Sequence, residues 1–131
     1  MTQRIMFVTD SAPDERLVAA LEEHGFAVST ETLPPGVIDA SVTPPDLMVL
    51  DVLDPYEGLK RLQEIKTRSD LKTASVLVLA EWGTGQATLA LANGADAFEP
   101  KPIDAKRLIA AVDRFLRSRL VMTAAAKIDR R

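Results

Sequence analysis

Short apolar runs recur along the chain and are separated by stretches in which apolar residues follow helical spacing. The runs cover residues 5–8, 26–31, 47–50, 76–79 and 97–98. Runs of this length, bounded by turn-forming residues, predict buried strands. Apolar residues at 17, 18 and 21, at 59, 62 and 65, and at 108, 109, 112, 115 and 116 recur every three or four positions and predict helices.

Local signals mark where several of these helices begin and end. Pro13, followed by two acids, suits a first helical turn, because proline lacks a donor there and acids complement the helix dipole. Gly25 is the expected residue just past the end of that helix. A shorter helix over 86–92 is expected to stop at Asn93-Gly94, and Asp104 is the expected N-cap of the last helix.

The stretch 33–46 has the weakest pattern. Two Pro-Pro pairs, at 34–35 and 44–45, enclose only residues 36–43. Because proline disfavours the helical conformation of the residue before it, a helix here is expected to have about two turns at most.

The predicted elements alternate strictly, five strands with five helices, which is typical of a parallel sheet covered on both faces. We therefore expect an α/β fold: a flavodoxin-like (βα)5 doubly wound sandwich with a five-stranded parallel sheet of order 2-1-3-4-5. Ligands of such sheets bind at the carboxyl ends of the strands. Asp10 follows the first strand, Asp51 ends the third and Lys101 follows the fifth. Two carboxylates and one ammonium are thus expected at one edge.

Composition narrows the class of protein further. Hydrophobic residues make up 47% and charged residues 27% of the 131 residues, as in an ordinary globular domain. No apolar run approaches the roughly 20 residues of a membrane-spanning helix, and the N-terminus lacks a signal-peptide pattern. The absence of cysteine excludes disulfides and thiolate metal sites, and a single histidine, His24, excludes a multi-histidine centre. We expect a cytoplasmic protein with no membrane contact.

Charge is unevenly placed along the chain. Residues 117–131 carry a net charge of +4, so the remaining 116 residues carry −7 of the total of −3. An acidic body opposes direct nucleic-acid binding by the domain. We interpret residues 3–118 as the domain, and 119–131 as a basic helix extension or linker.

Several segments, in this order, resemble the CheY-like receiver domains of bacterial two-component response regulators. They are residues 5–10, the sequence DLMVLDVLDP at 46–55, Gly58-Leu59, NGADAF at 93–98, and Lys101-Pro102. The resemblance covers about residues 3–118 and rests on the order and spacing of the pieces rather than on any one of them.

The resemblance implies roles for individual residues. Asp51 matches the phosphoryl acceptor, and Asp10, Asp51 and the backbone carbonyl of Leu53 match the ligands of Mg²⁺, which favours carboxylates and water. Lys101 matches the lysine that neutralises the acyl phosphate. The Lys101-Pro102 bond is typically cis in this family. Taken alone, Asp10 is more simply explained as a turn former and Lys101 as a surface lysine.

The chain departs from the family pattern at three places: two lie at the site, and the third is the Pro-interrupted stretch 33–46, which is a structural rather than a catalytic change. Thr9 replaces the first of two adjacent acids, so Mg²⁺ binding is expected to survive but weaken. Ala80 replaces the Ser or Thr that normally donates a hydrogen bond to the phosphoryl group. The aromatic switch position holds Phe98, which has no hydroxyl. Asp54 stands where the family usually has an apolar residue and is most simply a solvated loop acid.

Two further positions bear on the lifetime of an acyl phosphate. Leu53 and Trp82 occupy the positions that flank the path of attacking water in receivers, and both are large and apolar. We expect them to slow hydrolysis. Trp82 is also suited to a partner-binding surface.

Two readings of function remain open. In the first, the chain is a phosphoacceptor receiver that signals through the face formed by the helices at 86–92 and 104–118 and the strand at 97–98. In the second, it is a pseudo-receiver that binds partners without phosphorylation. A flavin- or nucleotide-binding enzyme is disfavoured, because the short Gly83-Thr84-Gly85 segment follows the wrong strand for a phosphate loop. We do not expect an enzyme beyond self-phosphorylation and autodephosphorylation.

The first reading implies particular partners. They are a sensor histidine kinase or phosphotransfer protein, a downstream protein or fused output domain, and, because receivers often pair through their last helices, a second copy of the chain. The sequence identifies none of them.

Overall fold

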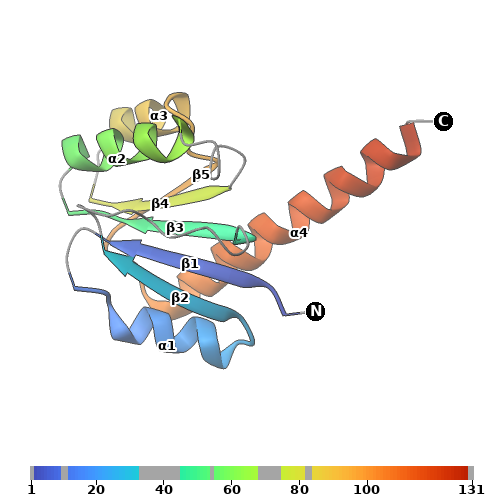
Figure 1. Cartoon of the computed structure of the whole chain (residues 1–131), viewed down its shortest axis with the longest axis horizontal. Coiled ribbons are helices and arrows are strands. Elements are labelled where there is room, and N and C mark those ends of the chain that lie inside the picture. The colour runs from blue at the N-terminus through green and yellow to red at the C-terminus, as the bar shows by residue number, and fades with distance from the viewer. Residues whose placement is uncertain are drawn as a thin grey trace.

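Five parallel strands form one sheet in the order β2-β1-β3-β4-β5 (Figure 1), which confirms the predicted topology. The computed structural model describes residues 2–9, 12–32, 45–53, 55–67, 75–81 and 84–129. The strands are β1 (Arg4–Thr9), β2 (Ala27–Thr32), β3 (Leu47–Asp51), β4 (Val76–Ala80) and β5 (Ala97–Pro100). The fold class is therefore the predicted flavodoxin-like one.

Helices cover both faces of the sheet. Within the described residues they are α1 (Glu15–Glu23), α2 (Pro55–Thr67), α3 (Thr84–Ala92) and α4 (Ala105–Asp129). In Figure 1, α2 and α3 lie together on one side of the sheet, and α1 and α4 cover the other. The expected helix within 33–46 lies outside the described residues.

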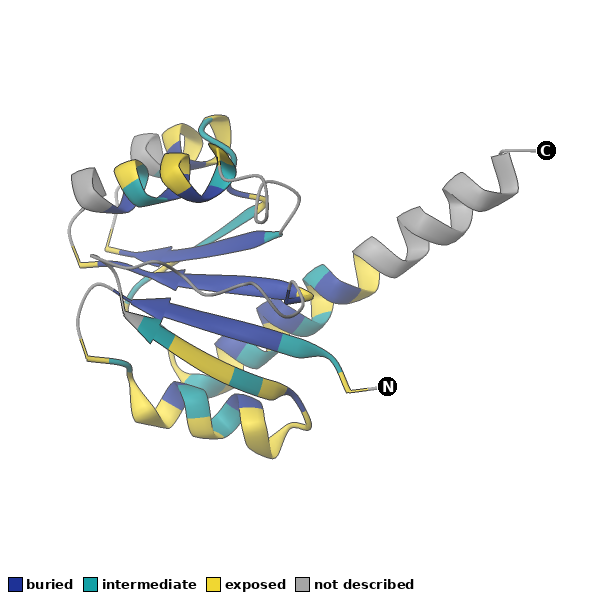
Figure 2. Ribbon diagram, in the orientation of Figure 1, coloured by how far each residue is buried: buried dark blue, intermediate teal, exposed yellow. Residues whose placement is uncertain are grey.

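Strand β4 is apolar throughout, and β3 is apolar up to its last residue, Asp51, because both faces of these strands are buried (Figure 2). Successive side chains point to opposite faces, so each strand feeds two cores. Met48 and Leu50 of β3 pack with α2 and α3, whereas Leu47 and Val49 pack with α1 and α4. This double burial explains why these runs lack the alternation of a half-exposed strand.

Side-chain caps fix the beginnings of α1 and α4. The carboxylate of Asp104 accepts a hydrogen bond from the Arg107 N–H at 2.8 Å, as predicted for an N-cap. Asp14 caps α1 in the same way through the Arg16 N–H at 3.1 Å. Pro13 therefore precedes the cap, and the prediction that it lies in the first turn was wrong by two positions: aspartate at the next position satisfies the helix N-terminus.

A polar cluster joins α2 to the turn between α3 and β5. Gly94 has φ of +110°, and a Cβ there would meet Lys66 Cγ at 3.0 Å. Lys66 pairs with Asp96 at 3.4 Å, and the same Asp96 oxygen accepts from the Val76 N–H at 2.8 Å. These contacts fix the start of β4 relative to β5, and hence where both strands end.

Helix α4 extends beyond the sheet on which it packs (Figure 1). Among the α4 residues whose side chains are described, up to 118, Leu116 is the last buried one, and the helical backbone continues to Asp129. The final 13 residues extend for about 20 Å and project away from the sheet (Figure 1). The division into a domain and an extension at 118/119 stays a prediction. None of the described helices is both long enough and apolar enough to cross a bilayer.

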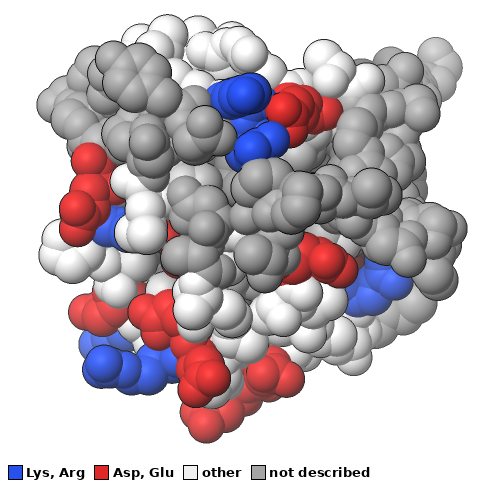
Figure 3. Space-filling model, turned by 60° about the vertical axis from the view of Figure 1, so that its left-hand side comes forward, with Lys and Arg blue, Asp and Glu red and all other residues white. Residues whose placement is uncertain are grey.

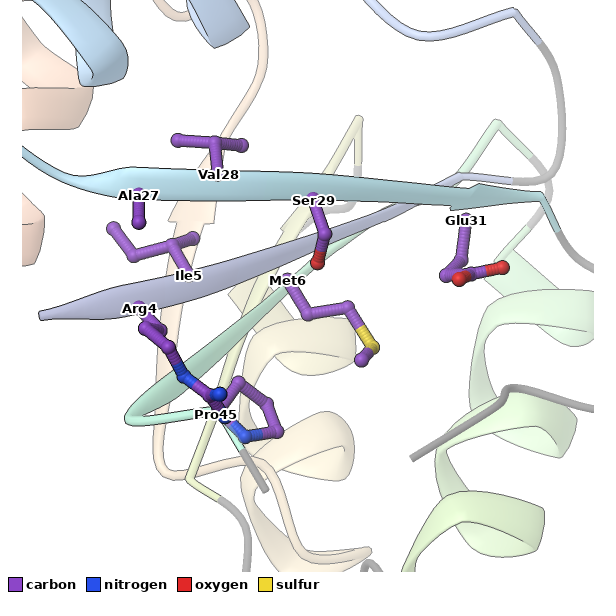
Figure 4. A pocket seen from close by; sticks show the side chains of 8 residues that line it. All are labelled: Arg4, Ile5, Met6, Ala27, Val28, Ser29, Glu31 and Pro45. Atoms are coloured by element: carbon purple, nitrogen blue, oxygen red, sulfur yellow. The ribbon is translucent and has the colours of Figure 1, made fainter. Parts of the chain in front are cut away.

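A shallow pocket of roughly 270 Å³ opens over the β1–β2 edge of the sheet (Figure 4). Arg4 and Met6 of β1, Ser29 and Glu31 of β2, and Pro45 contribute to its lining. It lies beside the first half of β1, away from the edge of the sheet at which Asp51 and Lys101 lie.

Candidate functional site

The carboxyl ends of the inner strands bring the predicted site residues together. In the register of the sheet, Asp51 of β3 lies opposite Thr9 of β1 on one side and Leu79 of β4 on the other. Ala80 then lies opposite Pro100 of β5, directly before Lys101. The carboxyl ends of β1, β3, β4 and β5 therefore lie next to one another at this edge.

Asp51 and Lys101 form an ion pair there, between Oδ1 and Nζ. The Asp51 side chain is only 11% exposed and that of Lys101 only 17%. A carboxylate with so little access to water requires a nearby cation, and the ammonium supplies it. The structure thus brings together the two residues that the sequence assigned to acceptor and counter-charge.

The backbone of Lys101 is fixed by the neighbouring strand. Its N–H donates to the carbonyl of Ala80 at 3.1 Å, which extends the β4–β5 ladder by one residue beyond Pro100. The Lys101-Pro102 peptide bond is cis, which confirms the prediction.

Thr9 and Ala80, the two site positions at which the sequence departs from the receiver pattern, are both buried next to the site. Thr9 is 1% exposed and Ala80 is 0% exposed. Ala80 has no hydroxyl, so this end of β4 presents no side-chain donor toward Asp51. Phe98 is partly buried and packs against the core cluster that contains Ala80.

Leu53 lies two residues beyond Asp51 and is 68% exposed, one of three large apolar residues exposed in the described part of the chain. Its side chain therefore lies outside the core, and the role in shielding an acyl phosphate stays a prediction. Asp10, Asp54 and Trp82 lie outside the described residues. Their predicted roles stay predictions.

The oxygen atoms of Asp51 and Leu53 are of the kind that bind a hard divalent cation. Asp51 supplies a carboxylate at the mouth of the edge, and the main-chain carbonyl of Leu53 follows two residues later. Among the described residues no three acidic or histidine side chains gather into a metal cluster. A site would therefore also need Asp10, together with water, a set that suits Mg²⁺.

The sequence did not predict a charged cluster beside the switch position. Glu99 of β5 accepts hydrogen bonds from Arg107 at 3.3 Å and from Arg114 at 3.2 Å, both on α4. The Glu99 side chain is only 15% exposed. The signal in the sequence was an acid inside a short strand followed by arginines seven residues apart, a spacing that aligns both on one helix face.

Comparison with known proteins places this architecture in a family. No protein-family model matches the chain, and no curated protein matches it. Among solved structures, the receiver domain of a signal transduction histidine kinase from Syntrophus aciditrophicus is 30% identical, with a TM-score of 0.73, over 89% of this chain and 92% of that one. The chemotaxis response regulator CheY4 of Vibrio cholerae is 20% identical, with a TM-score of 0.73, over 87% and 98%.

A third similar structure is longer than this chain. NtrX from Brucella abortus is 27% identical, with a TM-score of 0.77, and the match covers 98% of this chain but only 30% of NtrX. The matched part therefore includes most of α4. With the strand order and the 30% identical relative, these matches show that the chain belongs to the CheY-like response-regulator receiver domains.

Proposed function

We propose that this receiver domain accepts a phosphoryl group on Asp51 with the help of Mg²⁺. The observation that carries the proposal is the Asp51–Lys101 ion pair, formed between two mostly buried side chains at the carboxyl edge of the sheet. Burial of a carboxylate and an ammonium costs desolvation free energy. A role in phosphoryl transfer explains why both charged groups are kept at this edge.

The residues present suit the chemistry of phosphoryl transfer. A carboxylate oxygen of Asp51 attacks phosphorus as the bond from phosphorus to the donor's leaving group breaks, and that group departs with the bonding electrons. Lys101 Nζ then balances the charge of the new acyl phosphate. Mg²⁺, held by Asp10, Asp51 and the Leu53 carbonyl, would supply further neutralisation of the phosphoryl oxygens.

Transmission of this event is proposed to differ from the family pattern. Because the side chain of Ala80 has no donor, the end of β4 gains no hydrogen bond from this side chain on phosphorylation. The output is proposed to pass through the face of α3, β5 and α4, with a histidine kinase or phosphotransfer protein upstream. A downstream protein or fused output domain would receive it. No further enzymatic turnover is proposed beyond self-phosphorylation and autodephosphorylation.

A pseudo-receiver is the second candidate function. The buried Thr9 and Ala80 favour it, because Thr9 lacks the carboxylate and Ala80 lacks the hydroxyl that the family has at these positions. The retained Asp51–Lys101 pair opposes it.

Treatment with a small-molecule phosphodonor and Mg²⁺ tests the choice. We expect an intact-mass gain of one phosphoryl group in the native chain and none in Asp51→Asn. Glu64→Gln, which makes the same carboxylate-to-amide change on exposed α2, is expected to keep the gain. Absence of a gain in the native chain at millimolar Mg²⁺ would support the pseudo-receiver instead.

A further inference from the structure

Thr9 of β1 is the polar neighbour of Asp51 within the sheet. The two residues lie opposite each other in the register of β1 and β3. Neighbouring strands lie about 4.8 Å apart, so the two side chains begin close together. Both residues are buried, and among the described residues they are the two buried ones with a polar or charged side chain. The buried polar side chains of the described sheet therefore lie next to each other at its carboxyl edge.

The preceding residues of the two strands identify the face to which these side chains point. Phe7 lies opposite Val49 in register, and both belong to the core cluster formed with α1 and α4. Because side chains alternate along a strand, Thr9 and Asp51 point to that same face. On its other side, Asp51 lies opposite Leu79 of β4, which is fully apolar. The polar neighbour of Asp51 in the sheet therefore comes from β1.

A hydroxyl beside Asp51 is suited to an anion in a way that a carboxylate is not. The hydroxyl of Thr9 can rotate to donate a hydrogen bond, whereas an ionised carboxylate only accepts. A carboxylate at this position would also repel the negative charge of a phosphoryl group. Figure 3 turns this end of the sheet toward the viewer and shows acidic side chains at several places on the described surface. An anion that binds here therefore depends on donors inside the site rather than on attraction by the surrounding surface.

The other strands of the edge supply charge but no hydroxyl. Ala80, the last residue of β4, is fully buried and has only a methyl group. Lys101 follows β5 and pairs with Asp51. In the sheet, β1 lies on one side of β3, whereas β4 and β5 lie on the other. A hydroxyl from Thr9 and an ammonium from Lys101 would thus meet a group on Asp51 from opposite sides.

We propose that the hydroxyl of Thr9 donates a hydrogen bond to the phosphoryl group on Asp51, in place of the donor that is absent at Ala80. The inference rests on the proposed phosphorylation of Asp51 and adds to it a residue that binds the phosphoryl group. Hydrogen bonds to charged acceptors are stronger than those between neutral groups, and burial limits competition by water. The phosphoryl group is then bound from β1 and β5 rather than from β4 and β5.

Beryllium fluoride, which stands in for a phosphoryl group on a carboxylate, tests the proposal. Calorimetry at saturating Mg²⁺ measures its affinity for the native chain, Thr9→Val and Thr9→Ser. Valine keeps nearly the same shape without a donor, and serine keeps the donor. We expect an affinity at least about tenfold lower in Thr9→Val and within about twofold of the native value in Thr9→Ser. Equal affinities in the native chain and Thr9→Val would overturn the proposal, as would equal losses in the two variants.

The fluorine resonances of the bound anion separate a hydrogen bond from an effect of shape. A fluorine that accepts a hydrogen bond changes its chemical shift when H₂O is replaced by D₂O, because the bonded proton becomes a deuteron. We expect this isotope shift to decrease for one fluorine in Thr9→Val and to be retained in Thr9→Ser. Isotope shifts that stay unchanged for every fluorine in Thr9→Val would assign the donor to another group and contradict the proposal.

Two controls separate this inference from the proposed function on which it rests. Thr30→Val makes the same change at an exposed threonine of β2 and is expected to bind like the native chain. Asp51→Asn is expected not to bind. If the native chain does not bind, the proposed function and this inference both fail. If binding depends on Asp51 but is unchanged in Thr9→Val, only this inference fails. Circular dichroism of each variant confirms that the fold is retained.

Discussion

Asp51 and Lys101 pair across a strand that lies between them. Asp51 ends β3 and Lys101 follows β5, and β4 separates these strands in the sheet. The side chains meet at the edge where β4 ends with the fully buried Ala80. The pair is thus a consequence of sheet order and of where the strands end.

Removal of one member of this pair is expected to cost stability. Lys101→Met leaves the mostly buried Asp51 carboxylate without its cation, and we expect the free energy of unfolding to fall by about 1–3 kcal/mol. Asp51→Asn combined with Lys101→Met is expected to cost less than the sum of the single changes. Urea denaturation of the four proteins measures this cycle, and strict additivity would show that the two side chains do not interact.

Lys101→Met is also expected to impair the reaction of Asp51 with a phosphodonor, because nothing then neutralises the acyl phosphate at that position. We expect phosphorylation to slow by about tenfold or more, equivalent to about 1.4 kcal/mol of barrier. Intact-mass kinetics at saturating Mg²⁺ provide the measurement. An unchanged rate would assign the lysine to the stability of the fold alone.

Restoration of a hydroxyl at the end of β4 is expected to couple the site to Phe98. Ala80→Thr adds a donor toward Asp51, and Ala80→Val adds nearly the same volume without one. Both are expected to cost about 1–3 kcal/mol through crowding of a fully buried position. With beryllium fluoride and Mg²⁺, only the threonine variant should shift the ring resonances of Phe98. Equal shifts in the two variants would show that the hydroxyl does not couple the site to Phe98.

The exposed Leu53 is expected to lengthen the lifetime of the acyl phosphate by limiting the approach of water. Leu53→Asn places a polar group that can hold water at that position, and we expect the phosphorylated form to decay about tenfold faster, or about 1.4 kcal/mol in barrier. Combining it with Trp82→Glu should add to the effect. Mass spectrometry after removal of the phosphodonor follows the decay. A lifetime in the double variant equal to that of the native chain would refute the shielding role.

Gly94 is expected to be more sensitive to substitution than Gly25, although both have positive φ. Gly94→Ala brings a Cβ to 3.0 Å from Lys66 Cγ, whereas a Cβ at Gly25 meets nothing within 4 Å. We expect losses of about 1 kcal/mol for Gly25→Ala from backbone conformation alone, and a larger loss for Gly94→Ala. Thermal denaturation compares the two, and equal losses would mean that Lys66 moves aside freely.

The fold and the centre of the site could be predicted because they depend on patterns local in sequence. Apolar runs of strand length, alternating with helical spacing, leave few topologies, and the ends of parallel strands then place Asp51 and Lys101 at one edge. Strand β5 was predicted as residues 97–98 and extends to Pro100. Its second half has no apolar signal, and pairing with β4 defines it instead.

Contacts between distant side chains could not be predicted in the same way. His24 with Asp113, and Glu99 with Arg107, join elements whose separation depends on how helices pack on the sheet. Their chemistry is visible in the sequence, but which charged residue meets which follows from helix rotation and register.

Identification of the phosphorylated residue tests the central claim most directly. The chain is treated with a phosphodonor and Mg²⁺ and then with borohydride, which reduces an aspartyl phosphate to homoserine and marks its position in a peptide map. We predict homoserine at residue 51 in the native chain, dependent on Mg²⁺, and no homoserine anywhere in Asp51→Asn. A label at another aspartate, or none in the native chain, would contradict the assignment of Asp51 as the phosphoryl acceptor.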